Sequence, residues 1–145
     1  MRVPLIREGA PRRPGTFDLL GFTHFWAKSR SGKWIVKRST AKDRFRRALV
    51  RVTDWCTRHR HDRVREQQRA LAQKLKGHYG YYGIAGNARM LSRFLHEVTS
   101  VWRFWLNRRS QRARMTWERM HKLLVRYPLP QVRVAHPLIA RTANP

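Results

Sequence analysis

Four arginines between residues 44 and 58 have the spacing of side chains on one face of a helix, where they could bind phosphates. At about 100° per residue of an α-helix, their positions fall within a narrow sector of one helix face. Each guanidinium carries a permanent positive charge and a planar fork of N–H donors that matches a phosphate group. A basic stripe of this kind can also be an ordinary solvated helix face. The four residues are Arg44, Arg47, Arg51 and Arg58.

Two further groups of basic residues are candidates for the same chemistry. One group follows the third expected helix, and the other lies on an expected β-hairpin. We expect the first group to contact phosphates and the second to add secondary contacts. The first group is Arg108, Arg109, Arg112 and Arg114. The second group is Lys28, Lys33, Lys37 and Arg38.

The charge balance favours phosphate binding over a merely solvated surface. The 145 residues hold 33 Lys and Arg against 8 Asp and Glu, which gives a formal net charge of +25. A surface this basic repels itself until a polyanion neutralises it, and nucleic acids and anionic membranes are the abundant polyanions. The apolar helix faces are wide and typical of a core, so we expect a nucleic acid and no membrane.

The sequence does not nominate a catalytic site. The carboxylates occur singly, without the Asp-Asp or Asp-x-Asp pairs that hold two divalent metals. The Cys and His residues of 56–61 resemble half of a zinc site, and no second pair completes it. His96–Glu97 begins like a zinc-protease helix, but Ser100 stands where the second histidine would be. We therefore expect a protein that is not an enzyme and that uses no metal, cofactor or small-molecule substrate.

Cysteine usage and hydropathy set the expected compartment. The single Cys56 excludes an internal disulfide. The chain has no run of about 20 apolar residues and no apolar signal-peptide segment. We therefore expect a protein of the reducing cytoplasm.

The basic residues are expected on a mainly α fold with an N-terminal β-hairpin. Residues 1–15 are rich in Pro and Gly, which predicts a flexible lead-in. Residues 16–38 are β-branched and aromatic around a polar turn at 29–32, which predicts the hairpin. Residues 39–127 predict a bundle of three to four helices, and 128–145 an extended tail.

The first strand of the hairpin is expected to be apolar on both faces, so it needs cover on both sides. The alternating sets are Phe17, Leu19 and Phe25 on one face and Leu20, Phe22 and Trp26 on the other.

Capping residues and apolar periodicity define the expected helices. Thr40 and Asp43 have capping-box spacing before a helix that runs to about residue 58. A second helix is expected over 63–82, and Asn87 is expected to cap a long third helix. Thr116 opens a short fourth helix that stops before Pro128.

The end of the second helix degrades into four glycines spaced by three, at positions 77, 80, 83 and 86. They predict a helix end and a turn where backbones pack closely, rather than a glycine loop that clamps RNA. Tyr79 and Tyr81 stand among them. Core packing is the favoured interpretation of both rings, and stacking on unpaired bases is the alternative.

One long segment of the chain carries a family resemblance. Residues 75–130 hold paired tyrosines at 81–82, a Gly-Asn turn at 86–87, Trp102 and Trp105, the run Arg-Arg-Ser-Gln at 108–111 and Thr-Trp at 116–117. This segment resembles the maturase-specific domain of group II intron reverse transcriptases. Upstream, TFDLLGFTH at 16–24 is similar to the segment that closes the palm of those enzymes. The resemblance spans about residues 16–136 and covers only the C-terminal part: the end of the palm, the thumb and domain X.

The resemblance implies an RNA partner. In that family the helices after the palm act as a thumb that grips template and primer, and domain X binds the intron RNA so that it folds for splicing. The Tyr-x-Asp-Asp catalytic strand and the Cys-rich endonuclease tail have no counterpart in these 145 residues. The resemblance therefore implies a fragment that binds group II intron RNA and assists its splicing without polymerising.

Two alternatives stay open beside that interpretation. The chain could complement a separately encoded reverse transcriptase palm in trans, or it could be an inert remnant of intron decay. If the first strand faces a palm in the relatives, its apolar residues should form an exposed patch here.

Overall fold

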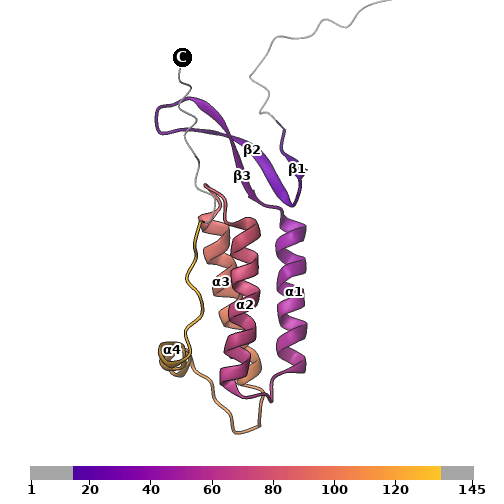
Figure 1. The fold of residues 1–145 in the computed structure, drawn as a ribbon, viewed down its shortest axis with the longest axis vertical. Coiled ribbons are helices and arrows are strands. Elements are labelled where there is room, and N and C mark those ends of the chain that lie inside the picture. Colours follow the sequence, from indigo (N-terminus) through magenta and orange to yellow (C-terminus); the bar gives the residue numbers. More distant parts are fainter. Residues whose placement is uncertain (1–14, 135–145) are drawn as a thin grey trace, which may run out of the picture.

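The computed structural model describes residues 15–134 and confirms a mainly α fold with an N-terminal β unit. Residues 1–14 of the expected lead-in and 135–145 of the expected tail lie outside the described part. Figure 1 shows a small sheet beyond one end of an upright helical bundle. The elements are β1 (Phe17–Leu19), β2 (Phe22–Lys28), β3 (Trp34–Thr40), α1 (Lys42–Arg58), α2 (Val64–Tyr82), α3 (Ala88–Leu106) and α4 (Trp117–Arg126).

The sheet has three antiparallel strands in the order β1-β2-β3, one more than the expected hairpin. Leu20 and Gly21 both adopt positive φ, 52° and 83°, and close a two-residue turn between β1 and β2. Such turns need positive φ at both central residues to match the twist of the strands. The expected turn at 29–32 joins β2 and β3, where the Gly32 N–H donates to the Ser29 carbonyl.

The extra turn corrects the predicted distribution of side chains over the two faces of the sheet. Phe17 pairs with His24 and Leu19 with Phe22, so β1 folds back onto β2. Directly paired residues project from the same face of an antiparallel sheet. Phe17 and Leu19 therefore share a face with Phe22 and Trp26, and not with Phe25.

Thr40 and Asn87 join the sheet to the bundle. The expected capping box at Thr40 is wrong, because Thr40 ends β3 and α1 begins at Lys42 after an Ala41 N-cap without a side-chain bond. The Thr40 N–H donates to Asn87 Oδ1, and Asn87 Nδ2 donates to Thr40 Oγ1, each at 2.9 Å. Asn87 occupies the N-cap position of α3, but its side chain serves this contact and the Tyr82 carbonyl instead of capping.

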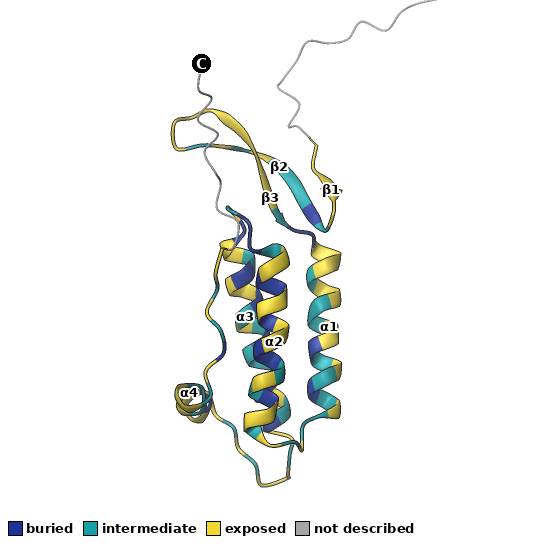
Figure 2. Ribbon diagram, viewed as in Figure 1, coloured by how far each residue is buried: buried dark blue, intermediate teal, exposed yellow. Residues whose placement is uncertain are grey.

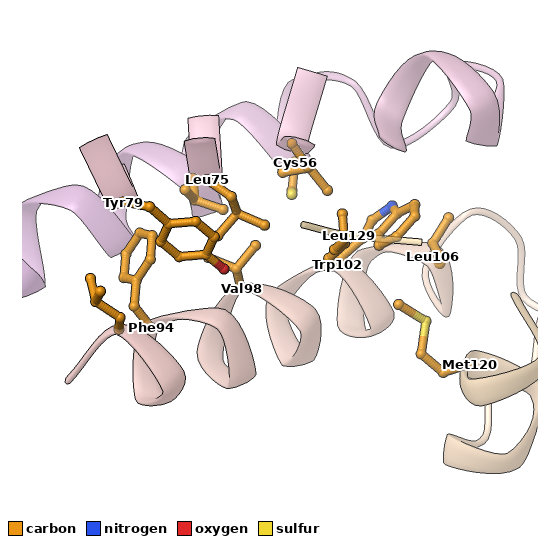
Figure 3. Packing of buried hydrophobic residues seen from close by; sticks show 12 residues of the cluster. Cys56, Leu75, Tyr79, Phe94, Val98, Trp102, Leu106, Met120 and Leu129 are labelled. Carbon is orange, nitrogen blue, oxygen red and sulfur yellow. The ribbon is translucent and has the colours of Figure 1, made fainter. Parts of the chain in front are cut away.

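Helix α3 is the centre of the core. It packs against both α1 and α2, and its fully buried residues include Val98 and Trp102. Figure 3 shows Val98 beside Leu75 and Tyr79 of α2, and Trp102 farther along the helix near Cys56, Leu106 and Leu129. The expected apolar stripe of α1 also lies here, with Val52 buried and Phe45, Ala48, Leu49 and Trp55 half-buried around it. Figure 2 shows the buried residues on the inner sides of the helices and exposed residues on the outer sides.

The last helix and the segment after it close the open side of the bundle. Helix α4 crosses the bundle and is seen nearly end-on in Figure 1. Its Met120 is fully buried. Leu129, which follows the helix, is buried to 5% exposure. Residues 128–134 then return along α2, where Tyr79 Oη donates to the Pro130 carbonyl at 2.9 Å.

A buried polar pair sits inside this core. Trp102 Nε1 donates to Gln67 Oε1 at 2.9 Å, and Gln67 Nε2 donates to the Asp62 carbonyl at 2.8 Å. Gln67 is buried on the inner face of α2. Gln68 instead donates to the Pro128 carbonyl on the outer side. The pair satisfies an indole N–H that would otherwise be buried without a partner.

Replacing one partner of this pair is expected to destabilise the fold. Gln67→Ala leaves the Trp102 N–H unsatisfied and opens a cavity, so the free energy of unfolding should fall by about 2–4 kcal/mol. Gln67→Leu combined with Trp102→Phe removes both polar groups and should be clearly less harmful than the sum of the two single changes. Urea unfolding of the wild type, Gln67→Ala, the single variants Gln67→Leu and Trp102→Phe and their double variant measures both effects. Strict additivity of Gln67→Leu and Trp102→Phe would contradict a direct interaction.

Candidate nucleic-acid interface

A groove opens between α1 and α2 at the end of the bundle that carries the sheet. Both helices pack on α3, and their own backbones stay apart, although Lys74 Nζ of α2 lies 5.6 Å from the centre of the Trp55 ring of α1. The groove has a volume of about 340 Å³. Arg44, Arg47 and Arg51 line its α1 wall, so three of the four arginines predicted as one row lie together. The remaining lining residues are Ala48, Val52, Lys74, Gly77, His78, Tyr81, Tyr82 and Phe94.

The groove is positively charged, and its lining includes no carboxylate. Arg47 Nη2 lies 3.8 Å from Asp43 Oδ2 in an exposed ion pair. Exposed pairs of this kind are worth about 0–1 kcal/mol, so Asp43 hardly competes with a phosphate. In the described part of the chain, neither Arg44 nor Arg51 has a carboxylate within ion-pair distance. Lys74 lies over the Trp55 ring at 5.6 Å and has no carboxylate of the described chain within ion-pair distance. Arg44, Arg51 and Lys74 therefore have no anionic partner among the described residues, and Arg47 has only the weak pair with Asp43.

The fourth predicted arginine, Arg58, lies away from the groove. It is at the C-terminal end of α1, where its Nε donates to the Asp54 carbonyl at 3.3 Å. Arg109 reaches the same end of the bundle, because its Nη2 donates to the carbonyl of Asp62. Arg58 therefore belongs with the arginines that follow α3, and the structure divides the predicted helical row into two sites.

The loop after α3 presents these remaining arginines. Asn107 Oδ1 accepts from the Met115 N–H at 2.7 Å, and Arg103 Nη1 donates to the Met115 carbonyl at 2.8 Å, which closes the loop. Arg108 lies with its guanidinium carbon 4.4 Å from the centre of the Phe104 ring. Arg112 and Arg114 are exposed, and Arg109 is half-buried by its bond to Asp62. The loop and Arg58 form a second basic site at the opposite end of the molecule from the sheet.

The four basic residues of the sheet are exposed but do not share one face. Lys28 and Arg38 project on the same side as Trp34, whose ring centre is 5.5 Å from Lys28 Nζ. Lys37 projects on the other side, and Lys33 lies in the turn before β3. These residues can serve phosphates only at the periphery of the molecule.

The sequence interpretation missed the α2 wall of the groove. Lys74, Gly77, His78 and Tyr81 are spaced by three and four, so they share one helix face. That spacing was readable once α2 was taken to continue to residue 82. The glycines were expected to end the helix, whereas Gly77 and Gly80 lie inside α2 and only Gly83 caps it. Tyr79 is buried as expected, but Tyr81 is 55% exposed at the rim of the groove.

One face of the sheet carries several exposed apolar side chains beside Lys28 and Arg38, and its members differ from either set expected for the first strand. We call this surface the apolar sheet face. Phe22 is not part of it, because the rings of Tyr81 and Tyr82 cover it at 6.0 and 5.3 Å between centroids. Leu20 is exposed in the turn rather than on this face. The members of the apolar sheet face are Phe17, Leu19, Trp26, Trp34 and Val36.

The groups considered for metal binding or catalysis lie apart. Within residues 15–134, no three His, Cys, Asp or Glu side chains gather as a metal site. Cys56 is in the core, and burial raises the pKa of its thiol to about 12. His59 Nδ1 bonds Asp62 Oδ2 at 2.7 Å. Among the described helices, none is both long and apolar enough to cross a membrane.

Comparison with known proteins adds no relative. No protein-family model, no curated protein and no solved structure matches this chain.

His78 should make the stability of the fold depend on pH. Burial lowers the pKa of its imidazole to about 4, from 6.5, and the charged neighbours on the groove lining are all cations that also oppose protonation. The unfolded chain therefore binds more protons than the folded chain between about pH 6.5 and 4. Above pH 6.5, His78 should not reduce the free energy of unfolding. As the pH drops from 6.5 to 4, the free energy of unfolding should fall, by roughly 2 kcal/mol at pH 4.5.

The variant His78→Phe isolates this effect, because a phenyl ring can keep the stacking on Phe94 and cannot titrate. Urea unfolding at pH 7 and pH 4.5 should show a smaller loss for the variant than for the wild type. Equal losses in the two proteins would show that the imidazole is not held neutral by the fold.

Proposed function

We propose that this protein binds RNA through its exposed arginines, with the groove between α1 and α2 as the main phosphate site. One observation carries the proposal: Arg44, Arg47, Arg51 and Lys74 surround one groove whose lining has no carboxylate. The net charge of +25 supports it, because only a polyanion can neutralise such a surface. The second basic site, formed by Arg58 and the loop after α3, would extend the contact along the bundle.

The RNA that we propose is a group II intron. The resemblance over residues 16–136 to the end of the palm, the thumb and domain X of group II intron reverse transcriptases favours this partner. The protein would act in the cytoplasm as a maturase-type fragment that binds the folded intron and assists its splicing. It would do so by binding alone, since no Tyr-x-Asp-Asp strand occurs in these residues.

A second candidate function is that of a subunit that docks on a separately encoded reverse transcriptase palm. The apolar sheet face favours it, because Trp26 and Trp34 are exposed on a sheet that the resemblance assigns to the palm. Co-purification with a palm protein encoded nearby should be lost in Trp26→Ser/Trp34→Ser. Retention by that variant would argue against docking through this face.

Binding to RNA should be strongly salt-dependent. If six to ten basic residues contact phosphates, the affinity should fall by roughly 10³ to 10⁵ between 50 and 200 mM salt. The triple variant Arg44→Gln/Arg47→Gln/Arg51→Gln should bind more weakly and reduce the slope of log K against log salt by about 2. Fluorescence anisotropy with a labelled RNA over a salt series measures both quantities.

A matched control removes the same charge elsewhere. Arg65, Arg69 and Lys76 are exposed on α2 and do not line the groove. Replacing all three by Gln leaves the net charge equal to that of the first triple variant. A flat salt response of the wild type, or equal loss in the two triple variants, would refute the groove as the main phosphate site.

Selectivity separates the maturase proposal from a decayed remnant. We expect tighter binding to a structured group II intron RNA than to an unrelated RNA duplex of equal length, and faster splicing of the cognate precursor when the protein is added. Competition binding and a splicing assay at fixed salt measure these outcomes. Equal affinity for the two RNAs with no effect on splicing would favour an inert remnant.

A further inference from the structure

The groove between α1 and α2 is hollow as well as charged. Its volume of about 340 Å³ lies within the range of about 300–1,000 Å³ that is typical of small-ligand sites. Ala48 and Gly77 provide the smallest side chains of its two walls. A Cβ atom built on Gly77 would meet no heavy atom within 4 Å. The side chains that line this part of the protein therefore leave space that larger residues could have filled.

Gly77, like Gly80, is a glycine that the backbone of α2 does not require. It lies inside α2, where glycine is less favourable than alanine because the unfolded chain loses more entropy. Positive φ is confined to other glycines and to Leu20 among the described residues, so the backbone at Gly77 does not require glycine. What glycine does provide at this position is the open space beside it.

An aromatic ring is held at the rim of this space. Tyr81 lines the groove and is 55% exposed, which is unusual for a large ring in a folded domain. Its hydroxyl donates to the Leu20 carbonyl at 2.8 Å, and its ring lies nearly parallel to Phe22 at 6.0 Å. The sheet therefore fixes this exposed ring in one orientation. Less side-chain entropy is then lost when another ring stacks on it.

The floor of the groove offers a further polar group. His78 is 9% exposed, stacks on Phe94 at 3.8 Å between ring centroids and lines the groove. Its Nε2 has no hydrogen-bond partner within the described chain. Buried polar atoms are normally paired. His78 Nε2 is the one buried side-chain polar atom of the groove lining that the described residues leave unpaired.

The arginines on the α1 wall are far enough apart to contact more than one phosphate of a strand. Arg44 and Arg51 are seven residues apart, which is about 10 Å along a helix axis. A strand that follows this wall therefore passes it with more than one phosphate. Lys74 stands on the other wall. A strand that follows the arginines would thus bring its sugars and bases to the open space between the helices.

We propose that the groove is a binding site for one unpaired nucleotide of RNA, with the base beside Gly77 and against the ring of Tyr81, and the flanking phosphates on the surrounding cations. This inference rests on the proposed RNA binding and adds a requirement for an unpaired base. A base within a duplex is stacked and paired and cannot enter the groove. Because every base has a stacking face, the site tolerates different bases.

Filling the groove tests this site directly. Gly77→Leu places a side chain in the open space without changing charge, and it should not weaken α2 because leucine is a good helix former. Gly80→Leu is the matched control, since Gly80 also lies inside α2 with open space at its Cβ but faces a different hollow. The two probes are a labelled 12-nucleotide oligouridine and a labelled 12-base-pair RNA duplex.

We expect Gly77→Leu to lower the affinity for the oligouridine by roughly tenfold, as the loss of one stacked base predicts, and to leave duplex affinity within about twofold. Gly80→Leu should leave both affinities within about twofold. Tyr81→Leu should act like Gly77→Leu. Tyr81→Phe keeps the ring and its packing on Phe22 but loses the hydrogen bond to the Leu20 carbonyl, so its affinity should fall by no more than about threefold. If Gly77→Leu does not fold, the comparison of Tyr81→Leu with Tyr81→Phe still decides whether a base stacks on the ring.

The failures of the two proposals are distinguishable. Tight oligouridine binding that Gly77→Leu and Tyr81→Leu leave unchanged would overturn the nucleotide site and leave RNA binding intact. Equal losses in Gly77→Leu and Gly80→Leu, or equal losses for the single strand and the duplex, would also overturn the site. Absence of binding to either RNA by the wild type would overturn the proposed RNA binding and this site with it.

Discussion

Helix α3 makes the rest of the structure possible, because it is the element on which two strongly basic helices are held together. Its buried side chains, from Leu91 to Leu106, give α1 and α2 a common apolar surface. Burial of this surface offsets the repulsion between helices whose outer faces carry mostly cations. Since α3 holds the two helices without bringing them into close contact, a groove remains between them, and both walls of that groove bear positive charge.

The same arrangement connects the sheet to the groove. Asn87, at the start of α3, bonds both the backbone and the hydroxyl of Thr40, and Tyr81 bonds the turn between β1 and β2. The sheet is thereby fixed to the end of the bundle at which the groove opens. Its apolar face stays uncovered within the described chain, and the exposed Tyr81 ring lies between that face and the arginines.

Much of the helical part was predictable, because apolar periodicity depends on local sequence alone. The stripe of α1, the extent of α2 and the Thr116 cap of α4 follow from spacing and capping residues. The turn at Leu20–Gly21 was missed because the segment alternates like one strand, and Thr40 was taken as a cap because its partner, Asn87, is distant in sequence. The groove could not be predicted from either helix, since it depends on how far apart α3 holds α1 and α2.

The central claim is that the α1 arginines contact the phosphates of RNA. The most direct test is an NMR titration of the arginine side-chain Nε–Hε resonances with a 12-nucleotide RNA at 50 mM salt. The account predicts shifts for Arg44, Arg47 and Arg51 that saturate with RNA and reverse at high salt, with little change at Arg65 and Arg69 on the outer side of α2. Shifts at Arg65 and Arg69 without shifts at the three groove arginines would contradict it.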